Sequence, residues 1–418
     1  MSDANGPDTT AQDEVEPLSF GRRLKIERER KHLSRAALGG LLGKSEGWVK
    51  GLEVGRLAQP KLPVLLRIAE VLRIRDLATL TGDQSINVEL FCGPGHDRLP
   101  AVRRALNLFP MLPDLDAPSH ANLRTRLNYA WSARHSAPDH REVIGRLLPD
   151  LIRDAQLAVR QAAAATDRRA AHALLSEAYS LTQFFVAYQP AQDLLWRVAE
   201  RGMAAAQESE DAHAIGIAGW LTVQAHRDAG DWEAADEVNR GVLSYLEPRL
   251  PDAPDDVLAI WGALTYEVGY TAARRADTPT AWRYWDQAQR VAHRLPAAYY
   301  HPVTSFSHAI MGAHAVTVAV ELHAGGESVR QAARAEASVI PSRPRRARHR
   351  VEQARAYHLD GQPEVAVATL DAAYEAAPDT VAWNGYARRI LLEELDSPIA
   401  ARRGRAAVTA ERIGLLAT

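Results

Sequence analysis

Apolar residues recur at helical spacing in four short groups between residues 18 and 82. Side chains three and four positions apart lie on one face of a helix. The spacing therefore predicts short amphipathic helices that pack around a common core. The groups are Phe20, Leu24 and Ile26; Leu38, Leu41 and Leu42; Trp48, Val49 and Leu52; and the run from Leu62 to Leu72.

Residues that favour helix ends stand between these groups. Ser34 and Ser45 precede the second and third groups, where a hydroxyl can accept a hydrogen bond from an unpaired backbone N–H. Gly43 falls in the turn between them, and Gly55 follows the third group, where a left-handed backbone favours glycine. Two short helices joined in this way are typical of a helix-turn-helix, whose second helix enters the major groove of DNA.

Charge divides the chain into three parts. Residues 1–17 contain five acids and no base, and residues 18–82 contain fourteen lysines and arginines against six acids, a net charge of +8. The remainder carries −5, which gives the formal total of −2. A +8 segment on an otherwise mildly acidic chain is expected of a domain that binds the phosphate backbone of nucleic acid. A solvated cationic surface is the alternative explanation.

These features, in this order, resemble the lambda-repressor-like (XRE-family) helix-turn-helix domain. The resemblance covers residues 20–80 and includes Leu33-Ser34 at the start of the second helix, Gly43 in the turn, and Glu53-x-Gly55 at the exit of the third. It implies a DNA-binding domain at residues 18–82. It also implies double-stranded DNA as a partner, bound by a homodimer on two half-sites.

The resemblance further implies roles for individual residues. Arg35 takes the place of a phosphate-contacting glutamine, and Arg56 is a second phosphate candidate. Arg28 and Glu53 match positions that pair across the first and third helices, which implies a structural role. The exposed start and face of the recognition helix are expected to contain Lys44, Ser45, Glu46, Gly47, Lys50 and Gly51. Of these, Glu46 can accept from a cytosine amine, and Lys50 can reach a phosphate or a guanine edge.

Glycines distinguish this segment from its relatives. Gly47 and Gly51 stand where relatives often have base-reading side chains, and Gly39 and Gly40 interrupt the second helix. Each interior helix glycine costs about 0.8–1 kcal/mol relative to alanine. Two hypotheses stay open. One is a DNA-binding domain that relies on phosphate contacts and DNA shape. The other is a repeat-scaffold adaptor whose degenerate helix-turn-helix does not bind DNA.

The remainder of the chain is predicted to be a linker and a long helical body. Residues 83–120 are rich in Pro, Gly and Asp, which interrupt helices, so we predict a partly ordered linker there and a disordered acidic tail at residues 1–17. Residues 121–418 contain long amphipathic runs, and none alternates with a period of two. The predicted fold class is all-α.

Two segments of the body share the spacing of a helical hairpin. In each, a glycine is followed five residues later by alanine and then by proline, as in a turn, a close helix crossing and a helix end. The segments contain Gly230, Ala235 and Pro248, and Gly361, Ala366 and Pro378; a weaker copy contains Ala281 and Pro296. These runs resemble tetratricopeptide (TPR) repeats with irregular spacing, which implies a TPR-like α-solenoid over residues 121–418.

An XRE-type domain joined to a TPR-like body resembles a group of regulators from high-GC Gram-positive bacteria. More distantly it is similar to peptide-sensing regulators, in which the concave repeat surface holds a signalling peptide. The resemblance implies that the solenoid mediates dimerisation and the sensing of a peptide or protein signal. Candidate groove residues are Trp220, Tyr266, Tyr270 and His314, with packing between helices as the alternative role.

Two further clusters receive a structural interpretation. His293, His301, His308 and His314 fall close together, but their spacing does not suit ligands on one helix face, so we expect no metal site. The arginines at positions 343, 345, 346, 348 and 350 are interpreted as the solvated face of a repeat helix.

Composition excludes several classes of protein. The chain has 418 residues, 46% of them hydrophobic and 24% charged, which is typical of a globular protein. A single cysteine, Cys92, excludes a disulfide scaffold, and no apolar run is long enough to cross a membrane. Nucleotide-binding, hydrolase and metalloprotease motifs are absent, so we expect no enzyme and no cofactor. The sequence thus predicts a cytoplasmic, sequence-specific DNA-binding transcriptional regulator.

Overall fold

The computed structural model describes residues 19–57, 60, 62–74, 77–82, 95–108 and 115–416. These residues form α-helices and short 3₁₀ turns without a β-strand, which confirms the predicted all-α class. No helix in these ranges is long and apolar enough to cross a membrane. The predicted acidic tail at residues 1–17, and Cys92, lie outside the described residues.

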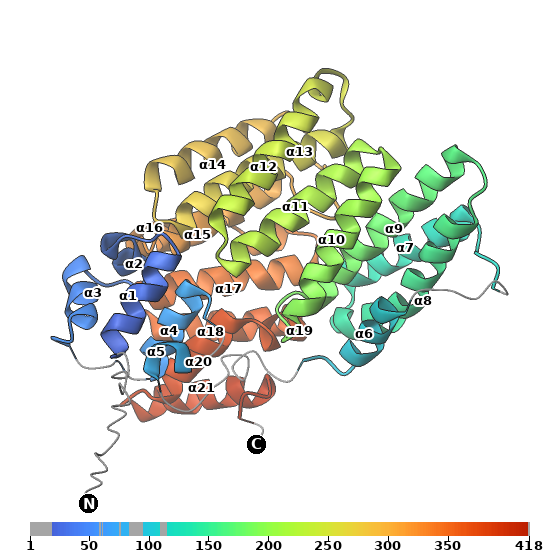
Figure 1. Cartoon of the computed structure of the whole chain (residues 1–418). Coiled ribbons are helices and arrows are strands. Elements are labelled where there is room, and N and C mark those ends of the chain that lie inside the picture. The colour runs from blue at the N-terminus through green and yellow to red at the C-terminus, as the bar shows by residue number, and fades with distance from the viewer. Residues whose placement is uncertain are drawn as a thin grey trace, which may run out of the picture.

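Five helices make up the N-terminal domain, drawn in blue in Figure 1. Leu24, Leu38, Leu52 and Leu72 belong to its core and are almost fully buried. The groups of apolar residues that predicted helices therefore converge on one core. The helices are α1 (Phe20–Arg30), α2 (Arg35–Leu41), α3 (Glu46–Glu53), α4 (Leu62–Leu72) and α5 (Ala78–Thr81).

The predicted capping residues lie at the ends of these helices, as expected. The hydroxyls of Ser34 and Ser45 accept hydrogen bonds from the backbone N–H three residues further on, at 3.0 and 3.2 Å. Gly43 in the turn has φ +63°, and Gly55 after α3 has φ +73°, both in the region that disfavours other residues. These local interactions fix the angle at which α3 leaves the turn.

Gly39 in α2 is explained by a close approach within the same turn. A Cβ atom there would lie 2.8 Å from the carbonyl oxygen of Lys44, so a side chain would displace the start of α3. Gly40, in contrast, faces open space. The close approach therefore explains why position 39 is a glycine, but it does not explain Gly40.

Helices α6 to α21 form the body. Those of its first half are α6 (Leu99–Asn107), α7 (His120–Ser136), α8 (His140–Gln161), α9 (Ala165–Val186), α10 (Gln192–Ser209), α11 (Ala212–Ala229), α12 (Trp232–Leu246) and α13 (Asp255–Arg274). Those of its second half are α14 (Thr278–Ala292), α15 (Met311–Glu321), α16 (Gly325–Arg334), α17 (Arg343–Leu359), α18 (Pro363–Ala376), α19 (Pro378–Ala382), α20 (Gly385–Leu395) and α21 (Ala400–Arg412).

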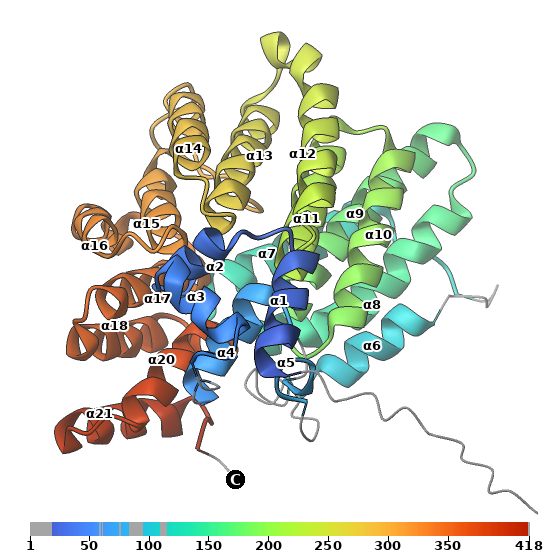
Figure 2. The same cartoon turned by 60° about the vertical axis from the view of Figure 1, so that its left-hand side comes forward.

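Consecutive helices of the body pack as hairpins, and the hairpins stack into an arc (Figure 2). Gly230 (φ +78°) and Gly361 (φ +77°) form the turns of α11/α12 and α17/α18. Ala235, Ala281 and Ala366 are completely buried where their helices cross a neighbour, because a larger side chain would force the helices apart. The predicted α-solenoid is confirmed by this arrangement.

Helix α6 lies inside the stretch that was predicted to be a linker. Its residues Val102 and Leu106 are completely buried in the main core of the body, and α6 packs against α8. The helical body therefore begins before residue 121, and the Pro-rich composition around α6 hid a nine-residue helix.

The N-terminal domain lies on the inner side of the arc (Figure 2). Glu70 of α4 forms an ion pair with Arg389 of α20, and Leu392 of α20 packs against the core of the domain. At the end of α4, Arg73 Nη2 lies 3.8 Å from Asp228 Oδ1 at the end of α11. Helix α4 thus joins the domain to two distant parts of the body.

Candidate nucleic-acid interface and central cavity

The start of α3 is presented to solvent, as a recognition helix requires. Val49 and Leu52 hold the opposite face of α3 in the core of the domain. Lys44 Nζ lies 5.9 Å from the centroid of the Trp48 ring, so the aromatic ring supports this ammonium group. Of the residues expected on the DNA-facing surface, the exposed ones are Lys44, Ser45, Glu46, Gly47, Lys50 and Arg56.

The two glycines of α3 have different surroundings. Gly47 is exposed, and the nearest atom to a Cβ built there is Ser45 Oγ at 3.8 Å. Gly51 is buried, and its Cβ would lie 3.0 Å from the Leu57 side chain. The expectation that Gly51 lies on the exposed face is wrong, because the segment after α3 folds back over it. Arg56, in this segment, donates to the carbonyl oxygen of Gly47 at 3.3 Å.

The expected structural pair, Arg28 and Glu53, forms a buried ion pair. Arg28 Nε donates to Glu53 Oε1 at 2.5 Å, and Arg28 Nη1 donates to the Leu33 carbonyl oxygen at 2.7 Å. Arg35 Nε donates to the other carboxylate oxygen of Glu53 at 2.7 Å. Burial by itself raises the pKa of Glu53, but the hydrogen bonds and charges of the two arginines outweigh it and lower that pKa. Sequence reasoning had assigned Arg35 to phosphate and missed this partner.

A cavity of about 530 Å³ lies between α4 and the concave side of the body. All four candidate groove residues, Trp220, Tyr266, Tyr270 and His314, line it. The rings of Tyr266 and His314 stack with centroids 3.7 Å apart. Burial lowers the pKa of His314 well below its ordinary value, and nearby positive charge lowers it further. His314 is therefore a neutral part of the aromatic wall at neutral pH.

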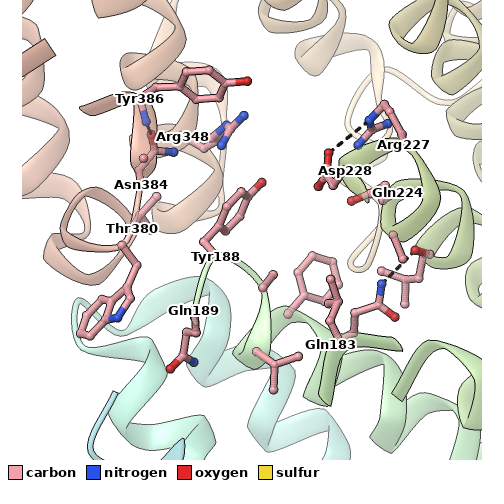
Figure 3. A pocket seen from close by; sticks show the side chains of 18 of the residues that line it. Gln183, Tyr188, Gln189, Gln224, Arg227, Asp228, Arg348, Thr380, Asn384 and Tyr386 are labelled. Atoms are coloured by element: carbon pink, nitrogen blue, oxygen red, sulfur yellow. Dashed lines mark hydrogen bonds and ion pairs between the residues drawn. The ribbon is translucent and has the colours of Figure 1, made fainter. Parts of the chain in front are cut away.

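Polar side chains face one another across this cavity (Figure 3). Arg348 and Tyr386 project from one side, and Arg227 and Asp228 from α11 on the other, with Tyr188 between them. Arg227 Nε lies 3.5 Å from Asp228 Oδ1. The cavity thus combines aromatic surface with several guanidinium groups.

The arginine run of α17 is not a solvated face, which corrects its interpretation from sequence. Arg345 and Arg348 line the cavity. Arg343 and Arg350 donate to backbone carbonyl oxygens in α18 at 2.9 and 2.6 Å. The run lies between the cavity and α18, because α17 packs against α18 on one side and borders the cavity on the other.

Buried carboxylates behind the cavity wall neutralise part of this positive charge. Glu321 accepts from Arg355 at 2.8 Å and lies 3.1 Å from Arg274. Burial alone raises the pKa of Glu321, but these two guanidinium groups outweigh it and lower that pKa strongly. Arg348 is paired with Glu352 at 2.7 Å. Such pairs are costly to break, because removal of one partner leaves a buried charge.

Metal ligands do not converge in the described part of the chain. No three His, Cys, Asp or Glu side chains there lie close enough together to hold one ion.

Two short helices joined by a glycine turn, with the second helix exposed at its start, define the N-terminal domain as a helix-turn-helix. Residues 19–80 match the family model described as "Helix-turn-helix domain". The matched segment includes α1 to α4 and most of α5. A comparison of the chain with curated proteins found no match. Fold and family match together indicate a DNA-binding regulator with a helical solenoid.

Proposed function

We propose that this protein is a sequence-specific transcriptional regulator of the cytoplasm, without catalytic activity, that binds double-stranded DNA as a homodimer. Its solenoid would mediate dimerisation and sense a peptide or protein signal. The observation that carries the proposal is the exposed start of α3, where Lys44 and Lys50 stand free of carboxylate partners among the described residues. Both lysines can therefore meet phosphates or base edges without first breaking an ion pair.

The proposed interface divides its contacts between positioning and base recognition. Lys44, Lys50 and Arg56 bind phosphates and fix α3 in the major groove. Glu46 accepts from a cytosine amine. Gly47 has no side chain, so the helix can approach the DNA closely there, and specificity at that position comes from DNA shape.

The solenoid supplies the regulatory half of the proposal. A peptide or protein that enters the concave surface changes the curvature of the arc, and with it the spacing of the two DNA-binding domains in a dimer. Such a ligand must bind the DNA-competent and DNA-incompetent forms with different affinity. A signal that binds the solenoid and leaves DNA affinity unchanged would contradict this mechanism.

DNA binding is tested by fluorescence anisotropy with a labelled duplex from upstream of the protein's own gene, at several salt concentrations. The double variant Lys44→Ala, Lys50→Ala is expected to weaken binding strongly. Because each phosphate contact contributes about 0.9 to the slope of log K against log salt, the slope should fall by about 2.

A matched control removes the same charge elsewhere. Arg168 and Arg169 are exposed at the start of α9, far from α3 in Figure 1. The double variant Arg168→Ala, Arg169→Ala should bind DNA like the wild type. If the folded wild-type protein fails to bind at low salt, the helix-turn-helix is a degenerate module. The alternative function, a repeat-scaffold adaptor that docks protein partners, then takes its place, and the exposed Gly47 favours that outcome.

A further inference from the structure

The central cavity has an excess of positive charge. Of the described residues that line it, nine are arginines and three are acids (Glu70, Asp228 and Glu267). Several of the arginines are paired with these acids or with carboxylates behind the wall. In contrast, Arg134 of α7, Arg141 of α8 and Arg345 of α17 have no carboxylate within ion-pair distance among the described residues.

These three guanidinium groups have partners that are neutral. Arg134 lies over the Phe184 ring, 4.0 Å from its centroid. Arg141 donates to the carbonyl oxygens of Phe185 and Ala187, and Arg345 Nη2 lies 3.4 Å from His314 Nδ1. The Nε atoms of Arg141 and Arg345 are buried without a hydrogen-bond partner. A buried charged donor without a partner is unfavourable, so it indicates a missing acceptor.

The charges of Arg141 and Arg345 act unfavourably on Arg134. Burial lowers the pKa of Arg134 to about 10, with smaller contributions from Arg141 and Arg345. Burial likewise lowers the pKa of Arg141 to about 10, although the nearby Asp379 carboxylate, which accepts from the Arg141 backbone N–H at 3.1 Å, acts in the opposite direction. Both remain protonated at neutral pH. An anion between them would relieve the repulsion and satisfy the free N–H groups.

The rest of the cavity defines what the anion is attached to. Trp220, Tyr266, Tyr270 and Trp383 contribute aromatic surface to the wall. The volume of about 530 Å³ is in the range of cavities that take drug-sized molecules. A guanidinium fork fits carboxylate and phosphate oxygens equally well.

We propose that this cavity binds a small anionic ligand, with a carboxylate or phosphate head held by Arg134, Arg141 and Arg345 and an aromatic or apolar body against the Trp and Tyr side chains. The ligand would be the signal of the proposed regulator, so this inference rests on the proposed function and narrows it. A short peptide qualifies through its C-terminal carboxylate or an acidic side chain.

The location of the site gives such a ligand direct access to the DNA-binding domain. Leu66, Ala69 and Glu70 of α4, together with Arg73 directly after it, form part of the cavity wall. A ligand in the cavity therefore contacts the same helix that joins the helix-turn-helix to α11 and α20. Its binding is expected to change DNA affinity, and DNA is expected to change ligand affinity by the same factor.

The test is calorimetric titration of the full chain with four probes. Three share a naphthyl group and are similar in size: naphthylacetic acid, naphthyl phosphate and the neutral naphthylethanol. The fourth, larger probe is a tetrapeptide made of Phe, Leu and Glu with a free C-terminus. The acid, phosphate and peptide arms distinguish the sources of the anion. At least one anionic probe should bind at millimolar concentration or below, and more than tenfold tighter than the neutral one.

Single variants on two helices locate the site. Arg345→Gln should weaken the binding of the anionic probe about tenfold or more, because a charge-assisted hydrogen bond is lost. Arg134→Gln, on another helix, should do the same. Arg346→Gln, next to Arg345 but outside the cavity wall, is the matched control and should bind like the wild type. Circular dichroism checks that each variant is folded.

The outcomes separate this inference from the proposed function. If no anionic probe binds, if the neutral probe binds equally well, or if both arginine variants bind like the control, the anion site is refuted, and DNA binding measured on the same protein is unaffected by that result. If an anionic probe binds through these arginines but the protein does not bind DNA, the anion site is supported and the proposed regulatory function is refuted.

Discussion

Replacement of Glu53 by Gln tests whether the ion pair inside the helix-turn-helix holds the domain together. The Glu53 side chain is 1% exposed and that of Arg28 is 7% exposed, so the pair is removed from water. The variant Glu53→Gln keeps the size of the side chain but removes its charge. One of its two terminal atoms then becomes a donor that faces a guanidinium group.

The expected loss of stability follows from what remains for Arg28. Breaking a buried ion pair costs about 3–5 kcal/mol, because an uncompensated charge stays buried. Arg28 keeps its hydrogen bond to the Leu33 carbonyl and its contact with the partly exposed Glu29 at 3.3 Å, which favours the lower end, about 3 kcal/mol. Loss of the partly exposed Arg35 contact adds little, because solvent screens such a pair.

Native-state hydrogen exchange of the full chain measures this effect locally. Peptides from α1 and α3 report the opening of the N-terminal domain, and peptides from α9 and α10 report the body. A loss of about 3 kcal/mol raises the exchange rate in α1 and α3 about a hundredfold, at roughly 1.4 kcal/mol per factor of ten. Exchange in α9 and α10 should not change.

Two further variants separate the effect of the buried charges from that of the partly exposed Arg35 contact. Arg35→Ala removes the exposed half of the cluster and should change exchange less than about fivefold. The double variant Arg28→Leu, Glu53→Leu removes both buried charges and should recover part of the loss. If Glu53→Gln leaves exchange in α1 and α3 within threefold of the wild type, the pair does not stabilise the domain and the reasoning fails.

Two other predictions concern the body. Gly262→Ala should destabilise the protein by about 1–3 kcal/mol in urea unfolding, because the new Cβ would lie 2.3 Å from the buried Phe306 ring. In the control Gly241→Ala, the new Cβ meets no atom within 4 Å, so this variant should stabilise the protein by up to about 1 kcal/mol. Equal effects of the two variants would contradict the packing argument. Burial lowers the pKa of His301 to about 3, so the unfolded chain takes up a proton at this residue before the folded chain does. The contribution of the neutral His301 to the free energy of unfolding is therefore complete above pH 6.5 and is lost by about 1.4 kcal/mol per pH unit as the pH falls toward 3. His301→Asn retains an acceptor for the Thr304 N–H and should make urea midpoints less dependent on pH between 6.5 and 5, and an unchanged dependence would show that His301 is not the group that titrates.

The local parts of the fold were predictable because they depend on neighbours in sequence. Ser34 and Ser45 cap helices, and Gly43 and Gly55 adopt left-handed backbone, for reasons that act within a few residues. The hairpins of the solenoid follow the same logic, since a turn glycine and a small residue such as Ala235 are separated by a fixed number of positions. Patterns of this kind are visible in one sequence.

The cavity was only half predictable because its charge comes from distant segments. Trp220, Tyr266, Tyr270 and His314 all line it, as expected of aromatic residues in one stretch of a solenoid. The three arginines without acidic partners come from α7, α8 and α17, and no local pattern distinguishes them from the other arginines of an Arg-rich chain. Only the curvature of the arc brings them together, and curvature is a sum of small rotations that the sequence does not display.

The contacts that cover Gly51 and α4 were also not predicted from the sequence. Gly51 is covered by Leu57, which corrects the expectation that it is exposed, and α4 forms an ion pair with the body that no pattern in the sequence indicated. Both observations concern what covers a helix, which periodicity alone cannot determine.

The interactions that hold α4 against the body are weak enough for a ligand to shift the position of this helix. Its two ion pairs to α20, from Arg67 and Glu70, and the longer contact of Arg73 with Asp228 are partly exposed, and each contributes about 0–1 kcal/mol, while Leu392 of α20 adds one apolar contact with the domain core. Their sum is comparable to the coupling energies of about 1–3 kcal/mol found in allosteric proteins. A ligand in the cavity touches Glu70 and Arg73 directly, so a tenfold preference for one position of α4 is enough to shift the domain measurably. A domain attached through a large apolar interface would not respond to so small a difference.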